Sequence, residues 1–312
     1  MPAPAIEVSE LRKAYGDVEA VRGLSFSVAR GEVFGLLGPN GAGKTTTVEI
    51  LEGHRRRSSG EVRVLGHDPA ARERAFQQQV GIVLQSAGFY PRLTVREAVT
   101  HAGKSYPRPL ATAETIELVG LTDRAEDRSD RLSGGQQRRL DLALALVGDP
   151  ELIFLDEPTT GFDPAARRTA WGVVGALRDL DKTVVLTTHY LDEAQALADR
   201  VAIVKDGRLV AEGAPSELGR SGSGYRVAYE SASGRVEHQT DDPTDLLHRL
   251  TGDVLARGER LEGLEVARPT LEEVYLELTE APRREAGRSP AAQARRDAEQ
   301  PHQDAGPEAP RR

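Results

Sequence analysis

The sequence contains no cysteine and no long apolar run. Without cysteine, the chain cannot form disulfides, carry out thiol catalysis or bind a metal through thiolates. A membrane-spanning helix needs roughly 18–20 consecutive apolar residues. The longest apolar runs here, Val33–Leu37 and Leu142–Val147, have only the length of a buried strand or a helix core. If the protein works at a membrane, another polypeptide must therefore supply the part that crosses it.

A basic excess is also absent. The chain carries 41 Lys and Arg residues against 49 Asp and Glu residues, a net charge of −8, which argues against a general nucleic-acid binder. Met1–Pro4 is not a basic stretch followed by an apolar core, so we expect no signal peptide. With 312 residues, 38% of them hydrophobic, the chain is long enough for one large domain and a small one.

Short apolar runs alternate with amphipathic stretches over residues 5–213, which predicts an α/β domain. The expected buried strands of this domain are Val33–Leu37, Val80–Leu84, Leu152–Leu155 and Thr183–Thr187. Lys205-Asp206-Gly207 has the composition of a hairpin turn between two further strands. Helical spacing from Thr94 to about Arg124 indicates a helical subdomain inserted at about residues 86–140.

The C-terminal third differs in composition. Residues 219–224 are rich in Gly and Ser and predict a flexible connection. Residues 224–280 combine two alternating strands with two segments of helical spacing, which predicts a small α+β module. Residues 281–312 have almost nothing to bury, so we expect a disordered tail. Separately, Arg55-Arg56-Arg57 could form an anion-binding patch, although a solvated loop is the favoured interpretation.

The most specific local motif is a glycine-rich loop between an expected strand and a helix expected over Thr45–Leu51. Its glycines let consecutive backbone amides turn toward phosphate oxygens, and the helix N-terminus adds partial positive charge. Lys44 would place a cation at the β- and γ-phosphates, and the Thr45 hydroxyl suits Mg²⁺. The residues predicted to bind the nucleotide phosphates are Gly38, Pro39, Asn40, Gly41, Ala42, Gly43, Lys44, Thr45 and Thr46.

Two carboxylates follow another buried strand. Asp156 ends the apolar run that begins at Leu152, and Glu157 comes next. A carboxylate at the end of a strand beside a phosphate loop can hold Mg²⁺, and a neighbouring carboxylate can polarise an attacking water. Taken alone, such a pair is more often a solvated turn. The phosphate loop in the same chain favours the catalytic interpretation.

Leu132-Ser133-Gly134-Gly135-Gln136 lies between the phosphate loop and Leu155-Asp156-Glu157-Pro158. With these motifs the chain resembles the ATP-binding cassette (ABC) ATPases over about residues 6–212. That resemblance implies a P-loop NTPase fold of the ABC type, with ATP and Mg²⁺ as cofactors. It gives Asp156 the role of magnesium ligand and Glu157 the role of general base.

The resemblance assigns three more residues. His189 matches the family's switch histidine, which contacts the γ-phosphate and orients the catalytic carboxylate. Gln85 matches a glutamine that touches Mg²⁺ or the lytic water. Tyr15 occupies the place of an aromatic ring that stacks on adenine, although it could instead pack on the N-terminal strand. Gly161-Phe162-Asp163 corresponds to a loop that crosses the dimer, with Phe162 where leucine is common.

In this family the LSGGQ residues serve a nucleotide that the partner chain holds. Ser133 offers a hydroxyl, and Gly134 and Gly135 let backbone amides approach an anion closely. Gln136 completes the motif, and the helix expected from Gln137 onward directs its N-terminus at the same anion. The resemblance therefore implies a homodimer that shares two ATP sites.

Pro269–Leu276 resembles the closing helix of exporter ATPases of the daunorubicin-resistance type, and Val21–Phe26 and Gly60–Gly66 also resemble that branch. It implies a peripheral ATPase on the cytoplasmic face of the cell membrane. That ATPase would drive an integral membrane permease that exports a drug, an antibiotic or a lipid-like substrate. Contact with the membrane would run only through the permease, and no nucleic acid would be bound.

Two alternatives stay open. One is a soluble ABC ATPase that acts on ribosomes or DNA. Ribosome-acting relatives usually carry two cassettes, DNA-repair relatives insert long coiled coils, and the acidic net charge disfavours both. The other is a regulatory sensor that binds ATP and scarcely hydrolyses it, which the presence of both Glu157 and His189 disfavours.

Overall fold

A computed structural model describes most of the chain. The described residues are 3–83, 92–160, 162, 164–221, 224–231, 234–256, 262–267 and 270–280. Contacts between residues divide the chain into two units, Met1–Thr279 and Glu280–Arg312. The elements presented below belong to the first unit, apart from the last residue of the final helix. The expected disordered tail, residues 281–312, lies outside the described residues.

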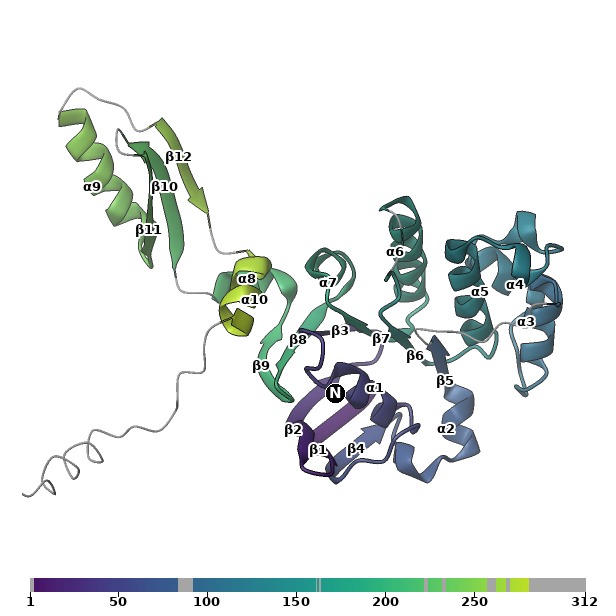
Figure 1. The fold of residues 1–312 in the computed structure, drawn as a ribbon. Helices are drawn as coiled ribbons and strands as arrows, with labels where there is room; N and C mark the ends of the chain where they lie inside the picture. The colour runs from purple at the N-terminus through teal and green to yellow at the C-terminus, as the bar shows by residue number, and fades with distance from the viewer. Residues whose placement is uncertain are drawn as a thin grey trace, which may run out of the picture. The chain divides into compact units, whose positions relative to one another are not determined.

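The centre of the fold is a six-stranded sheet with the strand order β5-β6-β7-β3-β8-β9 (Figure 1). Its strands are β3 (Val33–Leu37), β5 (Val80–Val83), β6 (Leu152–Asp156), β7 (Thr183–Thr188), β8 (Arg200–Lys205) and β9 (Arg208–Gly213). The first five in spatial order pair in parallel, and β9 pairs antiparallel with β8. Every residue of β3, β6 and β7 is buried, as expected for parallel strands covered on both faces. The predicted α/β class is confirmed.

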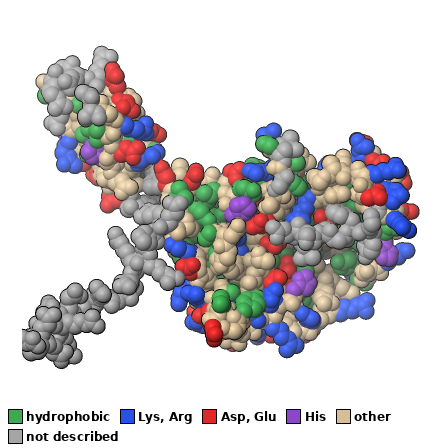
Figure 2. Space-filling view, in the orientation of Figure 1, with side chains coloured by type: hydrophobic (Ala, Val, Ile, Leu, Met, Phe, Trp, Pro, Cys, Tyr) green, Lys and Arg blue, Asp and Glu red, His purple; other side chains and the backbone are tan. Residues whose placement is uncertain are grey.

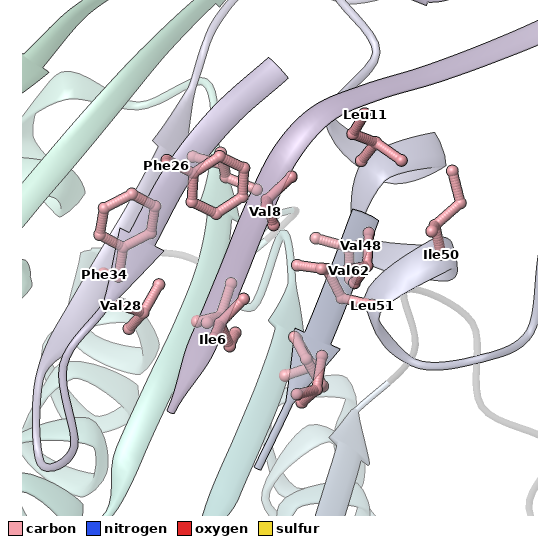
Figure 3. Close-up of a cluster of buried hydrophobic side chains, with 14 of the residues drawn as sticks. Ile6, Val8, Leu11, Phe26, Val28, Phe34, Val48, Ile50, Leu51 and Val62 are labelled. Atoms are coloured by element: carbon pink, nitrogen blue, oxygen red, sulfur yellow. The ribbon is translucent and has the colours of Figure 1, made fainter. Parts of the chain in front are cut away.

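A second sheet, which the sequence pattern did not predict, is antiparallel with the order β2-β1-β4. It comprises β1 (Ile6–Tyr15), β2 (Val18–Val28) and β4 (Ser59–Val64). Ile6 pairs with Val28 on one side and with Val64 on the other. Alternate side chains of this sheet enter a core that also receives Val48 and Leu51 of the first helix (Figure 3). In that core the rings of Phe26 and Phe34 stack with centroids 5.4 Å apart, which joins the two sheets.

Helices cover the central sheet and extend from it. They are α1 (Lys44–Leu51), α2 (Arg74–Gln79), α3 (Val95–Gly103), α4 (Thr112–Leu118), α5 (Gly134–Leu146), α6 (Pro164–Asp179) and α7 (Leu191–Leu197). Short 3₁₀ turns at Pro69–Ala71, Thr122–Arg124 and Ser129–Arg131 complete this part of the chain. Helices α3, α4 and α5 pack on one another (Figure 1). Their buried side chains share one core with Leu155 of the central sheet.

The C-terminal part holds a third sheet, ordered β11-β10-β12. Its elements are α8 (Pro215–Ser221), β10 (Tyr225–Ser231), β11 (Gly234–Thr240), α9 (Pro243–Ala256), β12 (Glu262–Ala267) and α10 (Leu271–Glu280). Helix α10 packs against α7 and β8, because Leu271 lies in one buried cluster with Ala194 and Ile203. The Lys205 ammonium also donates to the carbonyl of Leu278 at 3.0 Å. Two elements, α8 and β12, were not expected from the sequence.

Acidic and basic side chains are interspersed over the described surface that Figure 2 presents, without a broad patch of one sign. Among the described residues, no helix has both the length and the apolar character needed to span a bilayer.

Candidate active site

The glycine-rich loop joins the end of β3 to the start of α1. Gly43 precedes the helix with φ +102, a backbone conformation that side-chain-bearing residues rarely adopt. A Cβ at Gly38 would lie 2.2 Å from the carbonyl oxygen of Val204. These two positions therefore require glycine, and they let the loop turn tightly between the two elements. Thr45 is exposed and Thr46 is half-buried at the first turn of α1, where free backbone amides are found.

Lys44 is the buried cation of this loop. Its ammonium donates to the carbonyl of Gly38 at 2.7 Å and to that of Pro39 at 3.2 Å. Burial lowers the pKa of Lys44, whereas the nearby carboxylates of Glu157 and Asp156 raise it. Helix α1, which begins with Lys44, contacts strand β6, which ends at Asp156. Both carboxylates are therefore near enough to Lys44 for their charges to act on it.

Asp156 closes strand β6 and is 9% exposed. The hydroxyl of Thr187, on the neighbouring strand β7, donates to Asp156 Oδ1 at 2.5 Å. This bond fixes one oxygen of the carboxylate and orients the other. Thr187 was not among the residues predicted from the sequence. Its position at the end of a buried strand beside β6 was the only available signal.

Glu157 follows directly in an unusual backbone conformation, with φ +46. Its amide donates to both the carbonyl and the hydroxyl of Thr187, at 3.1 Å and 3.0 Å. The Thr160 hydroxyl donates to Glu157 Oε2 at 3.0 Å. A left-handed conformation at a residue other than glycine costs free energy and is often found at functional sites. Here the left-handed conformation falls at the first residue after β6, where the chain leaves the strand.

His189, which follows β7, reaches the same carboxylate. Its Nδ1 lies 3.3 Å from Glu157 Oε1. This separation suits a hydrogen bond in which the imidazole donates and the carboxylate accepts. The next ring, that of Tyr190, lies 4.1 Å from the imidazole between centroids. The structure thus brings together Lys44, Asp156, Glu157 and His189, which are scattered along the sequence.

Oxygen ligands for a divalent cation are present at this edge. Hard cations such as Mg²⁺ prefer carboxylate and other oxygen ligands, and helix α1, which carries the Thr45 hydroxyl, contacts strand β6, which ends in the Asp156 carboxylate. Within the described residues, no group of three or more His, Asp or Glu side chains forms a protein-only metal cage. The residues fit a cation that is held partly by the protein and partly by phosphate oxygens.

The predicted LSGGQ residues stand at the start of α5. Ser133 is the N-cap of that helix, and its hydroxyl accepts from the Gln136 amide at 3.3 Å. The Gln136 side chain accepts in return from the Ser133 amide at 2.8 Å. Such a reciprocal cap stabilises a helix start. Ser133 and Gly134 are exposed, and a Cβ at Gly134 would meet nothing within 4 Å, so an incoming group has room to approach.

Arg138, also on α5, is a site residue that the motifs did not reveal. Its guanidinium donates to the carbonyl of Asp156 at 3.0 Å. Burial lowers its pKa, and the charges of Asp141 and Asp156 oppose that effect. The helix that begins with the LSGGQ residues is therefore connected directly to the end of strand β6.

Tyr15 ends β1 and is 41% exposed. The Lys13 ammonium lies 4.9 Å from the centre of its ring, and the Arg55 guanidinium lies 5.2 Å from it. The ring is therefore accessible at the end of the strand and lies beside two cations, and its predicted role at adenine stays a prediction. Gln85, Gly161 and Asp163 lie outside the described residues, so their predicted roles stay predictions.

The fold and the residues at the carboxyl ends of β6 and β7 define a class of protein. It is the class of enzymes that cleave nucleoside triphosphates. The family model for ABC transporters matches residues 21–160. The chain is 44% identical to a Nod factor export ATP-binding protein of Paraburkholderia xenovorans, over 80% of this chain and 81% of that protein. It is 39% identical to a daunorubicin/doxorubicin resistance ATP-binding protein of Streptomyces peucetius, over 90% of this chain and 94% of that one.

Solved structures agree with this comparison. An ATP-binding subunit of an ABC transporter superposes with a TM-score of 0.62 at 26% identity, over 69% of this chain and 92% of its own. The chain belongs to the ATP-binding proteins of the ABC transporter family. It is an ATPase, and the fold and activity that the LSGGQ resemblance implied are confirmed.

Proposed function

We propose that this chain is the ATP-hydrolysing motor of an exporter, and that it acts as a homodimer on the cytoplasmic face of the cell membrane. The observation that carries the proposal is the contact between Glu157 and His189 beside the buried ammonium of Lys44. A sensor that only binds ATP has no need of a carboxylate held by a histidine next to the phosphate loop. A hydrolase uses such a residue to position or activate the attacking water.

Roles for the site residues follow from their chemistry. The phosphate-loop amides and Lys44 would hold the β- and γ-phosphates. Thr45 and Asp156, with Gln85, would hold Mg²⁺, which neutralises phosphate charge when bound. Glu157 would accept a proton from the attacking water, and His189 would fix the orientation of that carboxylate. Tyr15 would stack on the adenine ring, which matches its exposure at the end of β1.

The LSGGQ residues support a dimer in which each chain completes the site of the other. Ser133 and Gly134 are exposed at a helix N-terminus, where backbone amides and partial positive charge favour an anion. We assign the γ-phosphate bound by a second copy as that anion. The uncharged LSGGQ residues of one chain would then face the phosphate loop of the other chain, with the nucleotide between them.

An integral membrane permease would carry the cargo. Relatives named for Nod factor export and for resistance to daunorubicin support export of a drug, an antibiotic or a lipid-like compound. The interspersed surface charge and the net charge of −8 support the absence of a nucleic-acid partner. Residues 5–213 would form the ATP-binding domain, and residues 224–280 would form an accessory domain built around its own three-stranded sheet.

The proposal is tested by purifying the full-length chain together with its membrane neighbours in mild detergent. We expect a permease to co-purify, and we expect Mg²⁺-dependent ATP hydrolysis that the permease stimulates. A chain that binds ATP but shows no hydrolysis with or without the co-purified membrane protein would contradict the motor function. Recovery with ribosomal subunits instead of a membrane protein would favour the soluble alternative.

A further inference from the structure

Helix α7 contains a buried acidic residue that no role above accounts for. Glu193 is 1% exposed and lies four residues after His189. Fully buried carboxyl groups are rare, because removing them from water costs free energy unless other groups hydrogen-bond to them. The surroundings of Glu193 therefore show what the residue is for.

One oxygen of Glu193 connects three segments of the chain. The Thr159 hydroxyl donates to Glu193 Oε1 at 2.8 Å, and the Trp171 indole donates to the same oxygen at 3.4 Å. Thr159 lies two residues after Glu157, whereas Trp171 belongs to α6. The carboxyl thus links the loop that carries the proposed base, the helix after that loop, and the helix that follows His189.

Two further contacts join α6 to the segment around His189. Arg167 of α6 forms an ion pair with Asp192 at 3.1 Å. Its guanidinium lies 4.6 Å from the centre of the Tyr190 ring, and that ring lies against His189. Helix α6 therefore contacts this segment through Arg167 as well as through Trp171, whose partner Glu193 is buried.

The carboxyl of Glu193 is bonded as well as buried. Burial raises the pKa of Glu193, and hydrogen bonds from Thr188, Thr159 and Trp171 oppose the rise. Hydrogen bonds are directional, so this carboxyl fixes the groups bonded to it relative to one another. An apolar side chain in the same place would leave the Thr159 hydroxyl and the Trp171 indole without this partner.

We propose that Glu193 is a positioning residue that keeps Glu157 and His189 in contact by joining the loop after β6 to the start of α7. The inference rests on the proposed hydrolytic function, since it gives Glu193 no chemical step of its own. Loss of the link should let the two segments move apart. The nucleotide, which is bound by the phosphate loop, should be held as before.

The test compares variants of the full-length chain by steady-state ATP hydrolysis. Glu193→Ala should lower kcat about tenfold or more and change KM for ATP less than about threefold. Glu193→Gln retains an oxygen that accepts from Thr159 and Trp171, so it should restore kcat to within about threefold of the native value. Gln195→Ala removes an exposed polar side chain from the same helix and serves as the control.

A second variant and a spectroscopic signal protect the test against misfolding. Thr159→Val removes the donor without changing the volume much. It should lower kcat selectively and add little to the effect of Glu193→Ala, because both changes break one bond. Trp171 is the only tryptophan in the chain, so its fluorescence reports directly on the contact with Glu193. Its emission should shift in Glu193→Ala and stay native in Gln195→Ala.

The possible failures are distinguishable. Absence of ATP hydrolysis by the native protein would contradict the proposed function. If the native protein is active, a folded Glu193→Ala variant with native kcat would overturn the positioning role. So would equal losses from the Gln and Ala variants, or independent effects of Glu193→Ala and Thr159→Val.

Discussion

The hydroxyl of Thr187 is bonded to both consecutive carboxylate residues: it donates to Asp156 Oδ1 at 2.5 Å and accepts from the Glu157 amide at 3.0 Å. One side chain of β7 therefore sets the orientation of the proposed magnesium ligand and of the proposed base. This makes the end of β7 as important for the site as the end of β6.

Replacing Thr187 by Val should disturb both carboxylates at once. We expect turnover to fall about tenfold and the Mg²⁺ concentration for half-maximal activity to rise, because Asp156 loses its orienting donor. The free energy of unfolding should fall by about 1–3 kcal/mol. Thr183→Val is the matched control, because Thr183 is buried at the opposite end of the same strand. Its hydroxyl accepts from the Gly31 amide at 3.0 Å. Equal losses of turnover in the two variants would contradict the interpretation.

Glu157→Gln should abolish turnover and stabilise an ATP-dependent dimer. The amide keeps the shape of the side chain but cannot accept a proton from water, so the nucleotide would stay intact between two chains. Phosphate release and size-exclusion chromatography with ATP measure the two effects. Glu151→Gln is the control, because Glu151 precedes β6 at the end opposite to Glu157 and is an exposed partner of Arg30. Normal turnover in Glu157→Gln would rule out this residue as the base.

Ser133→Arg should block hydrolysis while the chain still binds ATP. The larger side chain would stand where the partner's phosphate has to enter, and the cap of α5 would be lost at a cost of about 1 kcal/mol. Thr94→Ala separates these effects, because Thr94 caps α3 with the same reciprocal geometry but lies outside the LSGGQ motif. Titration with a fluorescent ATP analogue measures binding. Loss of binding in Ser133→Arg would argue against a site shared between chains.

Glu52 makes stability depend on pH. Burial, followed by the charges of Asp156 and Glu49, raises the pKa of this carboxyl from 4.5 to about 8. The folded state therefore binds the proton more tightly than the unfolded state. The stabilising contribution is fully present below pH 4.5 and is lost as pH rises toward 8. Within that window stability should fall by at most about 1.4 kcal/mol per pH unit.

Glu52→Gln should remove most of this slope and should raise stability near pH 8. Urea unfolding at several pH values measures it. Glu61→Gln, a change at an exposed residue of β4, should keep the native slope. A variant at residue 52 with an unchanged pH dependence would contradict the assignment of the buried proton to Glu52.

The sequence predicted the central sheet well and the second sheet not at all. Strands β3, β6 and β7 are short segments rich in apolar and β-branched residues, and that length and composition favour a buried strand. In β1, exposed and buried residues alternate irregularly, and its pairing with β4 joins distant residues, such as Ile6 with Val64 and Arg12 with Ser59. Pairing over such a distance depends on tertiary packing, which local pattern does not encode.

The same distinction applies to the site. Lys44, Asp156 and Glu157 belong to contiguous motifs with a chemical reason for their spacing, so the sequence identified them. Arg138 donates to the backbone carbonyl of Asp156, and the Thr187 hydroxyl accepts from the Glu157 amide across to the neighbouring strand. Nothing in their own residue type distinguishes them from other arginines and threonines, and only the folded chain shows their partners.

The lysine of the phosphate loop has a further consequence. The Lys44 ammonium donates to the carbonyls of Gly38 and Pro39, so the loop is held in its turn by its own side chain. A phosphate group that binds this ammonium would compete with two backbone carbonyls for the same hydrogens. The contribution of Lys44 to phosphate affinity is therefore the difference between two sets of contacts, not the full strength of either set.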